Sequence, residues 1–376
     1  MKILIRQFLS KNHSWSVCGW GWANALISMG HEVHLFSTDG NCSAHMPANL
    51  KPYLIGYTEE NQPKVFGRLP DKEYDIQLSY TCIKNFPHML SNGSKNRFGV
   101  WCYEWAGKNV LPTGFAKHYQ SCDVLCAPSQ FAKQVFLDSG VPEDRLVVIP
   151  HGINIDEYKQ TTTINLPTNK KFKILANIAQ NHLRKNIPGL LEAYGKAFTN
   201  KDDVSLILKC KDKPVVAPFE ISVKNCLNDF YKKFPQHAEI KLFTEFIDDI
   251  SALYRSVDAV FTMSFCECFY FPALEGLASG KINISPNYGG QLDFLNDSNS
   301  LLVSGKEVRA NPKSMYWASN NNAIWFEPST DDAAEKLKFA YENYEKLNGD
   351  IDKQRSDVYV KYGWKNISSQ FLNLCK

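Results

Sequence analysis

Short apolar runs typical of buried strands alternate with longer helical segments along this chain of 376 residues. In the first half, Ser129 is placed to cap one of the helical segments. The expected strands cover 2–9, 31–37, 74–80, 97–103, 123–127 and 146–149, and the expected helices cover 21–29 and 130–139. Strands that alternate with helices predict crossover connections and therefore a parallel sheet covered by helices.

The alternation starts again after a polar interval at residues 155–170. Here the expected strands cover 173–179, 204–209, 240–243 and 259–264, with others near Ile282, Leu301 and Ile324, and the expected helices cover 187–198, 223–234, 248–255, 331–347 and 352–374. We therefore expect an α/β fold of two domains, 1–160 and 170–355, facing each other across a cleft. A C-terminal helix near 356–376 is expected to pack back on the first domain.

The composition excludes several classes of protein. Lys and Arg number 42 and Asp and Glu 39, and the net charge of +3 neither requires nor excludes nucleic acid. The eleven cysteines lack the spacing of a disulfide scaffold or a zinc site, which favours free thiols in a reducing compartment. The first ten residues are too short and too charged for a signal peptide, and no run of eighteen apolar residues exists. We expect a cytoplasmic protein without a membrane span.

Two carboxylates, Glu267 and Glu275, bracket an aromatic run in the second half. Glu267 lies in the loop at the carboxyl end of a predicted strand, and Glu275 lies in the first turns of the next helix. Open α/β sheets bind their ligands at that edge. An acidic helix start, favoured by the helix dipole, is the simpler interpretation.

A basic pair, Arg184 and Lys185, lies in the loop before the predicted helix 187–198. Two cations at this place can pair with a diphosphate and stabilise it as it leaves. A solvated basic turn is the alternative interpretation.

Together these motifs resemble the retaining glycosyltransferases of family four, which have the GT-B fold of two Rossmann-like domains. The resemblance spans nearly the whole chain and rests on the Glu-x7-Glu spacing and on Arg184-Lys185-Asn186. It implies that Glu275 holds the ribose hydroxyls of a nucleotide, that Glu267 lies near the donor sugar, and that Arg184 and Lys185 hold the donor diphosphate. Many members carry a further Arg about five residues before the Lys, where this chain has Gln180.

The resemblance also implies donor-binding residues around the signature. These are Phe269, Tyr270 and Phe271 in the aromatic run and the turn Gly289-Gly290. The family's usual Glu-Gly-Phe-Gly reads Glu267-Cys268-Phe269-Tyr270 here, so two larger residues replace small ones near the donor sugar.

Two candidates lie in the first half of the chain. Gly19 and Gly21 fall in the loop expected after the first strand, where backbone N–H groups can approach a phosphate; the family has a glycine-containing loop here too. Glu104 ends a strand of the first domain and could accept the proton of an acceptor hydroxyl or bind sugar hydroxyls. A rim carboxylate beside packed aromatic residues is the alternative for Glu104.

Two acidic features suggest other chemistry. Asp39 follows the second strand, where a dinucleotide-binding fold holds ribose, so an NAD-dependent dehydrogenase is a rival interpretation. However, the third glycine of the dinucleotide-binding pattern Gly-x-Gly-x-x-Gly is missing after the first strand. Asp350 and Asp352 have the spacing of a metal-binding Asp-x-Asp but lie in a polar stretch between helices. GT-B enzymes generally work without a bound metal, so we expect no metal and no cofactor.

The sequence thus predicts a retaining glycosyltransferase that moves a hexose or pentose from a nucleoside diphosphate sugar to an acceptor hydroxyl. Its expected catalytic residues are Glu267, Arg184, Lys185 and Glu104. The leaving phosphate would assist attack from the front side. A glycan, a lipid or a small molecule is the expected acceptor, and a hydroxylated base in DNA is the alternative. A non-catalytic sugar-binding protein remains a third class beside the dehydrogenase.

Overall fold

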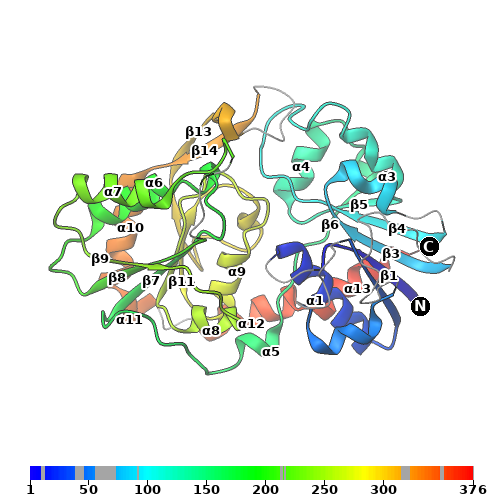
Figure 1. The fold of residues 1–376 in the computed structure, drawn as a ribbon, viewed down its shortest axis with the longest axis horizontal. Helices are drawn as coiled ribbons and strands as arrows, with labels where there is room; N and C mark the ends of the chain where they lie inside the picture. Colours follow the sequence, from blue (N-terminus) through cyan, green and yellow to red (C-terminus); the bar gives the residue numbers. More distant parts are fainter. Residues whose placement is uncertain are drawn as a thin grey trace. The chain divides into compact units, whose positions relative to one another are not determined.

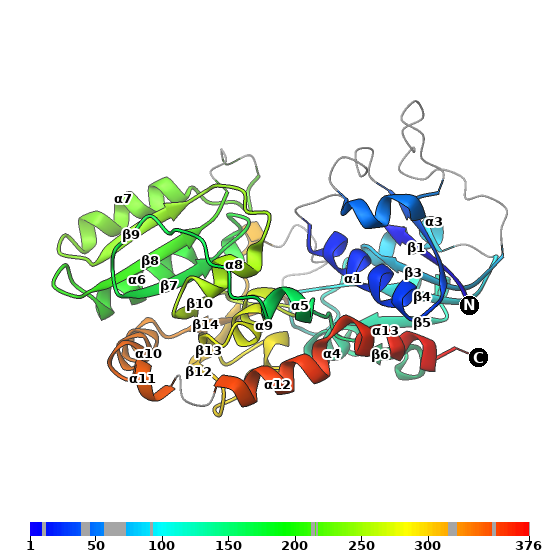
Figure 2. The same ribbon diagram turned by 90° about the horizontal axis from the view of Figure 1, so that it is seen from below.

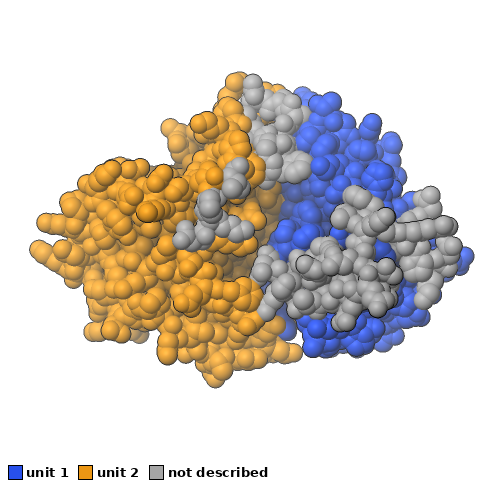
Figure 3. Space-filling model, viewed as in Figure 1, with its two compact units in different colours: residues 1–103, 108–154, 360–376 blue, residues 104–107, 155–359 orange. Residues whose placement is uncertain are grey.

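The computed structural model describes residues 1–9, 13–38, 46–55, 73–90, 93–211, 215, 217–314, 322–347 and 351–375, with only the backbone for 351–354. These residues form two compact units, whose elements are labelled in Figure 1 and whose extents are coloured in Figure 3. Unit 1 contains Met1–Tyr103, Lys108–Asn154 and Val360–Lys376, and unit 2 contains Glu104–Gly107 and Ile155–Tyr359.

Unit 1 is built on a parallel sheet with the strand order β2-β1-β3-β4-β5-β6. The strands are β1 (Lys2–Gln7), β2 (Glu32–Ser37), β3 (Tyr74–Tyr80), β4 (Ser94–Val100), β5 (Val124–Ala127) and β6 (Leu146–Val148). β1 is buried from Ile3 onward, with the apolar run Ile3–Ile5 at its centre, because it pairs on both sides, with β2 and β3.

The helices of unit 1 include both ends of the chain. They are α1 (Ser14–Ser28), α3 (Phe86–Met89), α4 (Gln130–Asp138) and α13 (Trp364–Asn373), with 3₁₀ turns η1 (Ala48–Tyr53), η2 (Ile83–Asn85), η3 (Ala116–Ser121) and η4 (Glu143–Arg145). Ser129 caps α4, since its hydroxyl accepts from Ala132 N at 3.1 Å. The C-terminal α13 packs on α1 (Figure 2). The rings of Trp22 and Phe371 are 5.4 Å apart there.

Gly19 and Gly21 lie inside α1, which begins at Ser14, so the prediction of a glycine loop before this helix is wrong. A Cβ on Gly19 would lie 2.5 Å from Gln7 Nε2, and a Cβ on Gly21 would lie 2.1 Å from Trp364 Cε2. These glycines allow α1 to approach β1 and α13 closely. Their backbone N–H groups lie within the helix, where N–H groups bond to the preceding turn and have none left for a phosphate.

Unit 2 is built on a second parallel sheet with the order β12-β11-β10-β7-β8-β9. Its strands are β7 (Phe172–Asn177), β8 (Val204–Lys209), β9 (Glu239–Phe243), β10 (Ala259–Phe261), β11 (Ile282–Pro286) and β12 (Leu301–Val303). The strand predicted near Ile324 is β14 (Ile324–Pro328), which pairs antiparallel with β13 (Gly305–Arg309) in a separate two-stranded sheet.

Helices cover both faces of the second sheet. The helices that lie in unit 2 are α5 (Ile155–Tyr158), α6 (Ile187–Ala197), α7 (Val223–Lys233), α8 (Ile250–Arg255), α9 (Phe271–Ala278), α10 (Thr330–Glu342), α11 (Tyr344–Leu347) and α12 (Ile351–Tyr362) up to Tyr359, with 3₁₀ turns η5 (Leu183–Lys185), η6 (Gly290–Asp293) and η7 (Pro312–Ser314). On one face Ile174, Leu206 and Phe261 pack with residues of α6, α7 and α10. On the other, Leu175, Ile207 and Val260 pack with α8.

Three predicted segments differ in detail. The predicted helix 331–347 is α10 followed by α11, and the predicted helix 352–374 is α12 and α13, separated at Gly363. The predicted linker 155–170 begins with the helical turn α5. Among the described residues, no helix is long and apolar enough to cross a membrane, and no two cysteines form a disulfide.

Candidate functional site

The strand order of unit 2 reverses between β7 and β10. From β7 the chain adds β8 and β9 on one side and then β10, β11 and β12 on the other. The loops that leave the carboxyl ends of two such neighbours diverge, which makes this the ligand-binding position of open α/β sheets. Arg184 and Lys185 follow β7, and Glu267 follows β10. The topology therefore brings three of the predicted residues to one place.

The basic pair is fixed by local backbone chemistry. Leu183–Lys185 form the 3₁₀ turn η5, and Asn186 follows in the left-handed region with φ 49°. Asn186 is a residue type that tolerates this conformation, and its side chain also caps α6 by accepting from Gly189 N at 3.1 Å. The carbonyl of Arg184 accepts from Phe265 N at 2.8 Å, which ties this turn to the loop after β10.

Glu267 is the shared partner of both cations. Its Oε2 lies 2.7 Å from Arg184 Nη1, and its Oε1 lies 2.6 Å from Lys185 Nζ. The Glu267 side chain is only 6% exposed. Arg184 also donates to the carbonyl of Cys266 at 3.1 Å and pairs with Glu104 Oε1 at 3.3 Å. Two cations and two carboxylates thus form one buried or half-buried network.

Glu104 belongs to unit 2, although the sequence placed it at a strand end of the first domain. The short segment Glu104–Gly107 joins β14, because Ala106 O accepts from Ile324 N at 2.9 Å. A Cβ on Gly107 would lie 2.4 Å from Asn322 O, so only glycine allows this close approach.

The charges in the network determine the protonation states. Burial alone would raise the pKa of Glu267, but the charges and hydrogen bonds of Arg184 and Lys185 outweigh it and lower this pKa to about 2. Burial lowers the pKa of Lys185 despite the attraction of Glu267. Burial, with the two nearby cations, lowers the pKa of His182 to about 3. Glu267 is therefore a carboxylate and His182 is neutral at ordinary pH.

The Gly289-Gly290 turn holds the main chain of Glu267. Gly290 N donates to Glu267 O at 2.8 Å. Gly289 has φ 94°, and a Cβ there would lie 2.8 Å from Glu267 O. The predicted turn is therefore next to the network, and Gly289 is required there by its positive φ and by its close approach to Glu267.

Glu275 lies in α9 and accepts hydrogen bonds from the hydroxyls of Tyr158 and Tyr254. Tyr254 in turn accepts from Asn177 Nδ2 at 3.0 Å, at the end of β7. Burial raises the pKa of Glu275 to about 7, although the two hydroxyls oppose this shift. Tyr158, Tyr254 and Asn177 were not among the predicted site residues, because they come from three separate elements and no spacing pattern relates them.

Tyr270 lies near both carboxylates, Glu267 and Glu275. Lys185 Nζ lies 5.3 Å from the centre of its ring, and its hydroxyl bonds to Thr262. Tyr270 adopts φ 67° at the N-cap of α9, a conformation that favours glycine. Phe269 is buried and packs between the rings of Phe271 and Phe294, at 5.4 and 5.3 Å. Its side chain is therefore enclosed by protein.

The structure does not describe the placement of the remaining acidic candidates. Asp39 and Asp350 lie outside the described residues, as does the side chain of Asp352. Among the residues whose positions are described, no group of three His, Cys, Asp or Glu side chains is placed to hold a metal ion.

Comparison with known proteins identifies relatives in sequence and in fold. Residues 20–157 match the model of Glycosyltransferase Family 4. An uncharacterised glycosyltransferase of Methanocaldococcus jannaschii is 22% identical over 95% of this chain and 92% of its own.

Two solved structures show the same architecture. A glycosyltransferase from Rickettsia africae superimposes with a TM-score of 0.69 and 19% identity, covering 100% of this chain and 98% of that one. Anabaena HepE, solved in complex with UDP-glucose, superimposes with a TM-score of 0.66 and 14% identity, covering 99% and 98%. This chain has two six-stranded parallel sheets, and together with these likenesses they identify the fold as GT-B.

Proposed function

Because the chain is a glycosyltransferase of the family-four type with the GT-B fold, we propose that unit 2 binds a nucleoside diphosphate sugar through Arg184 and Lys185. The observation that carries this proposal is the buried cation pair at the strand-order reversal of the sheet. A diphosphate gains negative charge as its bond to the sugar breaks, and positive charge fixed in advance stabilises that state. The family match and the glycosyltransferase relative favour this proposal over the dehydrogenase and over the non-catalytic sugar-binding protein.

Glu267 holds the cations in this proposal and does not transfer a proton. Each of its oxygens pairs with one of the cations Arg184 and Lys185, and with its pKa lowered to about 2 it stays ionised. Glu104, paired with Arg184, orients that guanidinium from the other side.

The proposed reaction retains the configuration of the sugar. The acceptor oxygen bonds to the anomeric carbon on the face from which the diphosphate leaves. The bond from that carbon to the phosphate oxygen breaks, and the acceptor's proton passes to the departing phosphate oxygen. Arg184 and Lys185 stabilise the diphosphate throughout, so the chemistry draws on charge held by protein side chains.

Glu275 binds the ribose of the donor in this proposal. A carboxylate has about four acceptor positions, and the hydroxyls of Tyr158 and Tyr254 use two of them. Two positions are left for the 2′- and 3′-hydroxyls of a ribose.

The test is a panel of UDP-, GDP- and ADP-sugars, scored by thermal stabilisation and by donor hydrolysis. UDP-glucose comes first, since it is the ligand of the HepE structure. Glu275→Ala should weaken binding of the matching nucleoside diphosphate at least about tenfold in calorimetry. Glu192→Ala, which removes a carboxylate on α6 that pairs with Lys196 and Lys233, is the control and should leave affinity unchanged. Equal affinity in the Glu275 and Glu192 variants would remove Glu275 from the site.

The acceptor is proposed to be a hydroxyl of a glycan, a lipid or a small molecule, and a hydroxylated DNA base is the alternative. Once a donor is known, transfer of its labelled sugar to each class separates them. If the labelled sugar enters only DNA that contains hydroxymethylated bases, the acceptor is a DNA base.

A further inference from the structure

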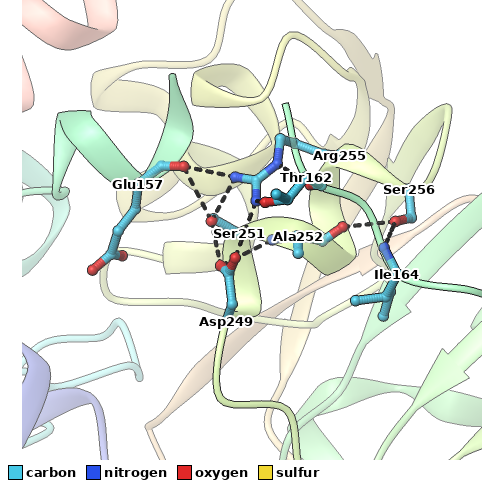
Figure 4. Close-up of polar contacts among 8 residues, drawn as sticks. All are labelled: Glu157, Thr162, Ile164, Asp249, Ser251, Ala252, Arg255 and Ser256. Carbon is cyan, nitrogen blue, oxygen red and sulfur yellow. Dashed lines mark hydrogen bonds and ion pairs between the residues drawn. The ribbon is translucent and has the colours of Figure 1, made fainter. Parts of the chain in front are cut away.

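Arg255, the last residue of α8, holds the chain that precedes β7 with three of its guanidinium hydrogen bonds and the start of α8 with the other two (Figure 4). Its Nε donates to Thr162 O at 2.5 Å, and its Nη2 donates to Thr162 Oγ1 at 2.8 Å. Its Nη1 donates to Glu157 O and to Ser251 Oγ, both at 2.6 Å. Its Nη2 also bonds Asp249 at 3.1 Å. All five N–H groups of the guanidinium therefore have acceptors.

The residue after Glu157 is Tyr158, which reaches the proposed ribose carboxylate. Tyr158 is buried, and its hydroxyl bonds to Glu275. Its helical turn α5 has four residues, too few to be stable without tertiary contacts. Tyr254, the other donor to Glu275, immediately precedes Arg255 in α8. The three short helices α5, α8 and α9 pack on one another, so one arginine fixes the turn that delivers Tyr158.

We propose that Arg255 is a positioning residue for Glu275: it holds the carbonyl of Glu157 and thereby keeps the Tyr158 hydroxyl on the carboxylate. The part of this inference that concerns ribose depends on the proposed function, while the part that concerns Tyr158 and Glu275 does not. Arg255 then acts on donor binding without touching the donor.

The pKa of Glu275 depends on the position of the Tyr158 hydroxyl. The groups that act on it are Tyr158 from α5, Tyr254 from α8, the nearby charge of Glu157, and Tyr270 before α9. Burial and Glu157 raise the pKa of Glu275, and the hydroxyls of Tyr254 and Tyr158 lower it. Withdrawal of Tyr158 must therefore make Glu275 harder to ionise.

The test follows the ionisation of Glu275 by NMR of the ligand-free protein labelled with ¹³C-glutamate, with Glu275→Gln to assign the signal. Tyr158→Phe keeps the ring and removes the hydroxyl, and it should move the titration midpoint of Glu275 upward by about one pH unit. Arg255→Lys should move it in the same direction. The double variant should go no further than the larger single variant. A wild-type midpoint in Arg255→Lys, or additive shifts in the double variant, would overturn the proposal.

Two further variants keep the result decisive. Ser251→Ala replaces Arg255→Lys in the test if that variant fails to fold. It removes one acceptor of Arg255 and one contact to Glu157 O, so the titration midpoint of Glu275 should move upward by a smaller amount. Arg145→Lys is the matched control, because Arg145 also holds backbone carbonyls, those of Cys122 and Asp123 in unit 1, and it should leave the midpoint unchanged.

Calorimetry with UDP on the same variants separates this inference from the proposed function. Weaker UDP binding in Arg255→Lys and Tyr158→Phe supports both the positioning role of Arg255 and the proposed donor binding by Glu275. If the wild type binds none of the nucleoside diphosphates, the proposed function fails, and the titration still decides the role of Arg255.

Discussion

Lys185 Nζ lies 2.6 Å from Glu267 Oε1, and this ion pair joins the loop after β7 to the loop after β10. Both side chains are buried, so the pair has lost most of its hydration and depends on its partners for compensation. A buried charge that loses its partner cannot regain water. The network is consequently sensitive to removal of any single member, whichever function it serves.

The first prediction is that Glu267→Gln lowers the free energy of unfolding by about 3–5 kcal/mol, because Lys185 then becomes a buried cation without a counter-ion. Chemical denaturation at neutral pH measures this. Glu192→Gln, whose pairs with Lys196 and Lys233 are more exposed, should cost less than about 1 kcal/mol. Equal losses in the two variants would contradict the prediction.

The second prediction concerns turnover. Arg184→Ala combined with Lys185→Ala should lower turnover on the identified donor by at least about a hundredfold, since the charge that stabilises the leaving diphosphate is gone. The same double variant leaves Glu267 buried and unpaired, so it should also be less stable. Adding Glu267→Gln should restore stability without restoring turnover, which separates folding from chemistry.

The control for that experiment is Lys232→Ala with Lys233→Ala. These are also adjacent cations, but they lie at the end of α7 with exposed side chains. This variant should keep full turnover. Near-normal turnover in the Arg184 and Lys185 variant would show that these residues do not act on the diphosphate.

The third prediction follows from the raised pKa of Glu275, about 7 against an ordinary 4.5. The folded protein binds this proton more tightly than the unfolded chain, so the contribution to stability is full below about 4.5 and is lost as the pH rises through about 7. His182 has the opposite effect, because its lowered pKa contributes stability that is lost as the pH falls from 6.5 toward 3. The two must therefore be separated by substitution.

Denaturation of wild type and Glu275→Gln between about pH 5 and 8 makes that separation. The difference in free energy of unfolding between wild type and Glu275→Gln should shrink as the pH rises, and it should level off above about pH 7. Nucleotide affinity should instead rise with pH over the same interval, because ribose hydroxyls donate to the charged form. A difference that does not vary with pH would show that Glu275 titrates outside this window.

Residues from one continuous segment were predictable, and contacts between segments were not. The strand-helix alternation was enough to place Arg184, Lys185 and Glu267 at the carboxyl ends of strands, because that follows from the order of elements along the chain. The partners of Glu275 come from α5 and α8, and a polar interval such as 155–170 gives no periodicity from which to infer Tyr158. Side-chain pairing across loops depends on tertiary packing.

Gly19 and Gly21 show a different limit. Two glycines near a strand-helix junction fit a phosphate loop or a closely packed helix equally well, since both need a position without a Cβ. The neighbour that decides between them is Trp364, far along the chain in α13. No local pattern contains that information.

The fourth prediction is that activity survives excess chelator. The proposed site supplies positive charge from Arg184 and Lys185, so a metal ion is not needed to stabilise the leaving diphosphate. Turnover should be the same in EDTA as in added magnesium or manganese. Activity lost in EDTA and restored by either ion would require a metal site, and Asp350 and Asp352 would be the first residues to replace.

The fifth prediction tests the packing role of Gly21. In Gly21→Ala the new Cβ would lie 2.1 Å from Trp364 Cε2, a distance that no rotamer change at residue 21 can relieve. The free energy of unfolding should fall by about 1–3 kcal/mol, as overpacked cores typically show. Trp364→Leu, combined with Gly21→Ala, should recover part of that loss, which identifies the indole as the obstacle. Affinity for the nucleoside diphosphate should stay at the wild-type value in the folded variant, because the Gly21 N–H lies inside α1. An affinity loss of tenfold or more in a stably folded Gly21→Ala protein would return this glycine to the donor site.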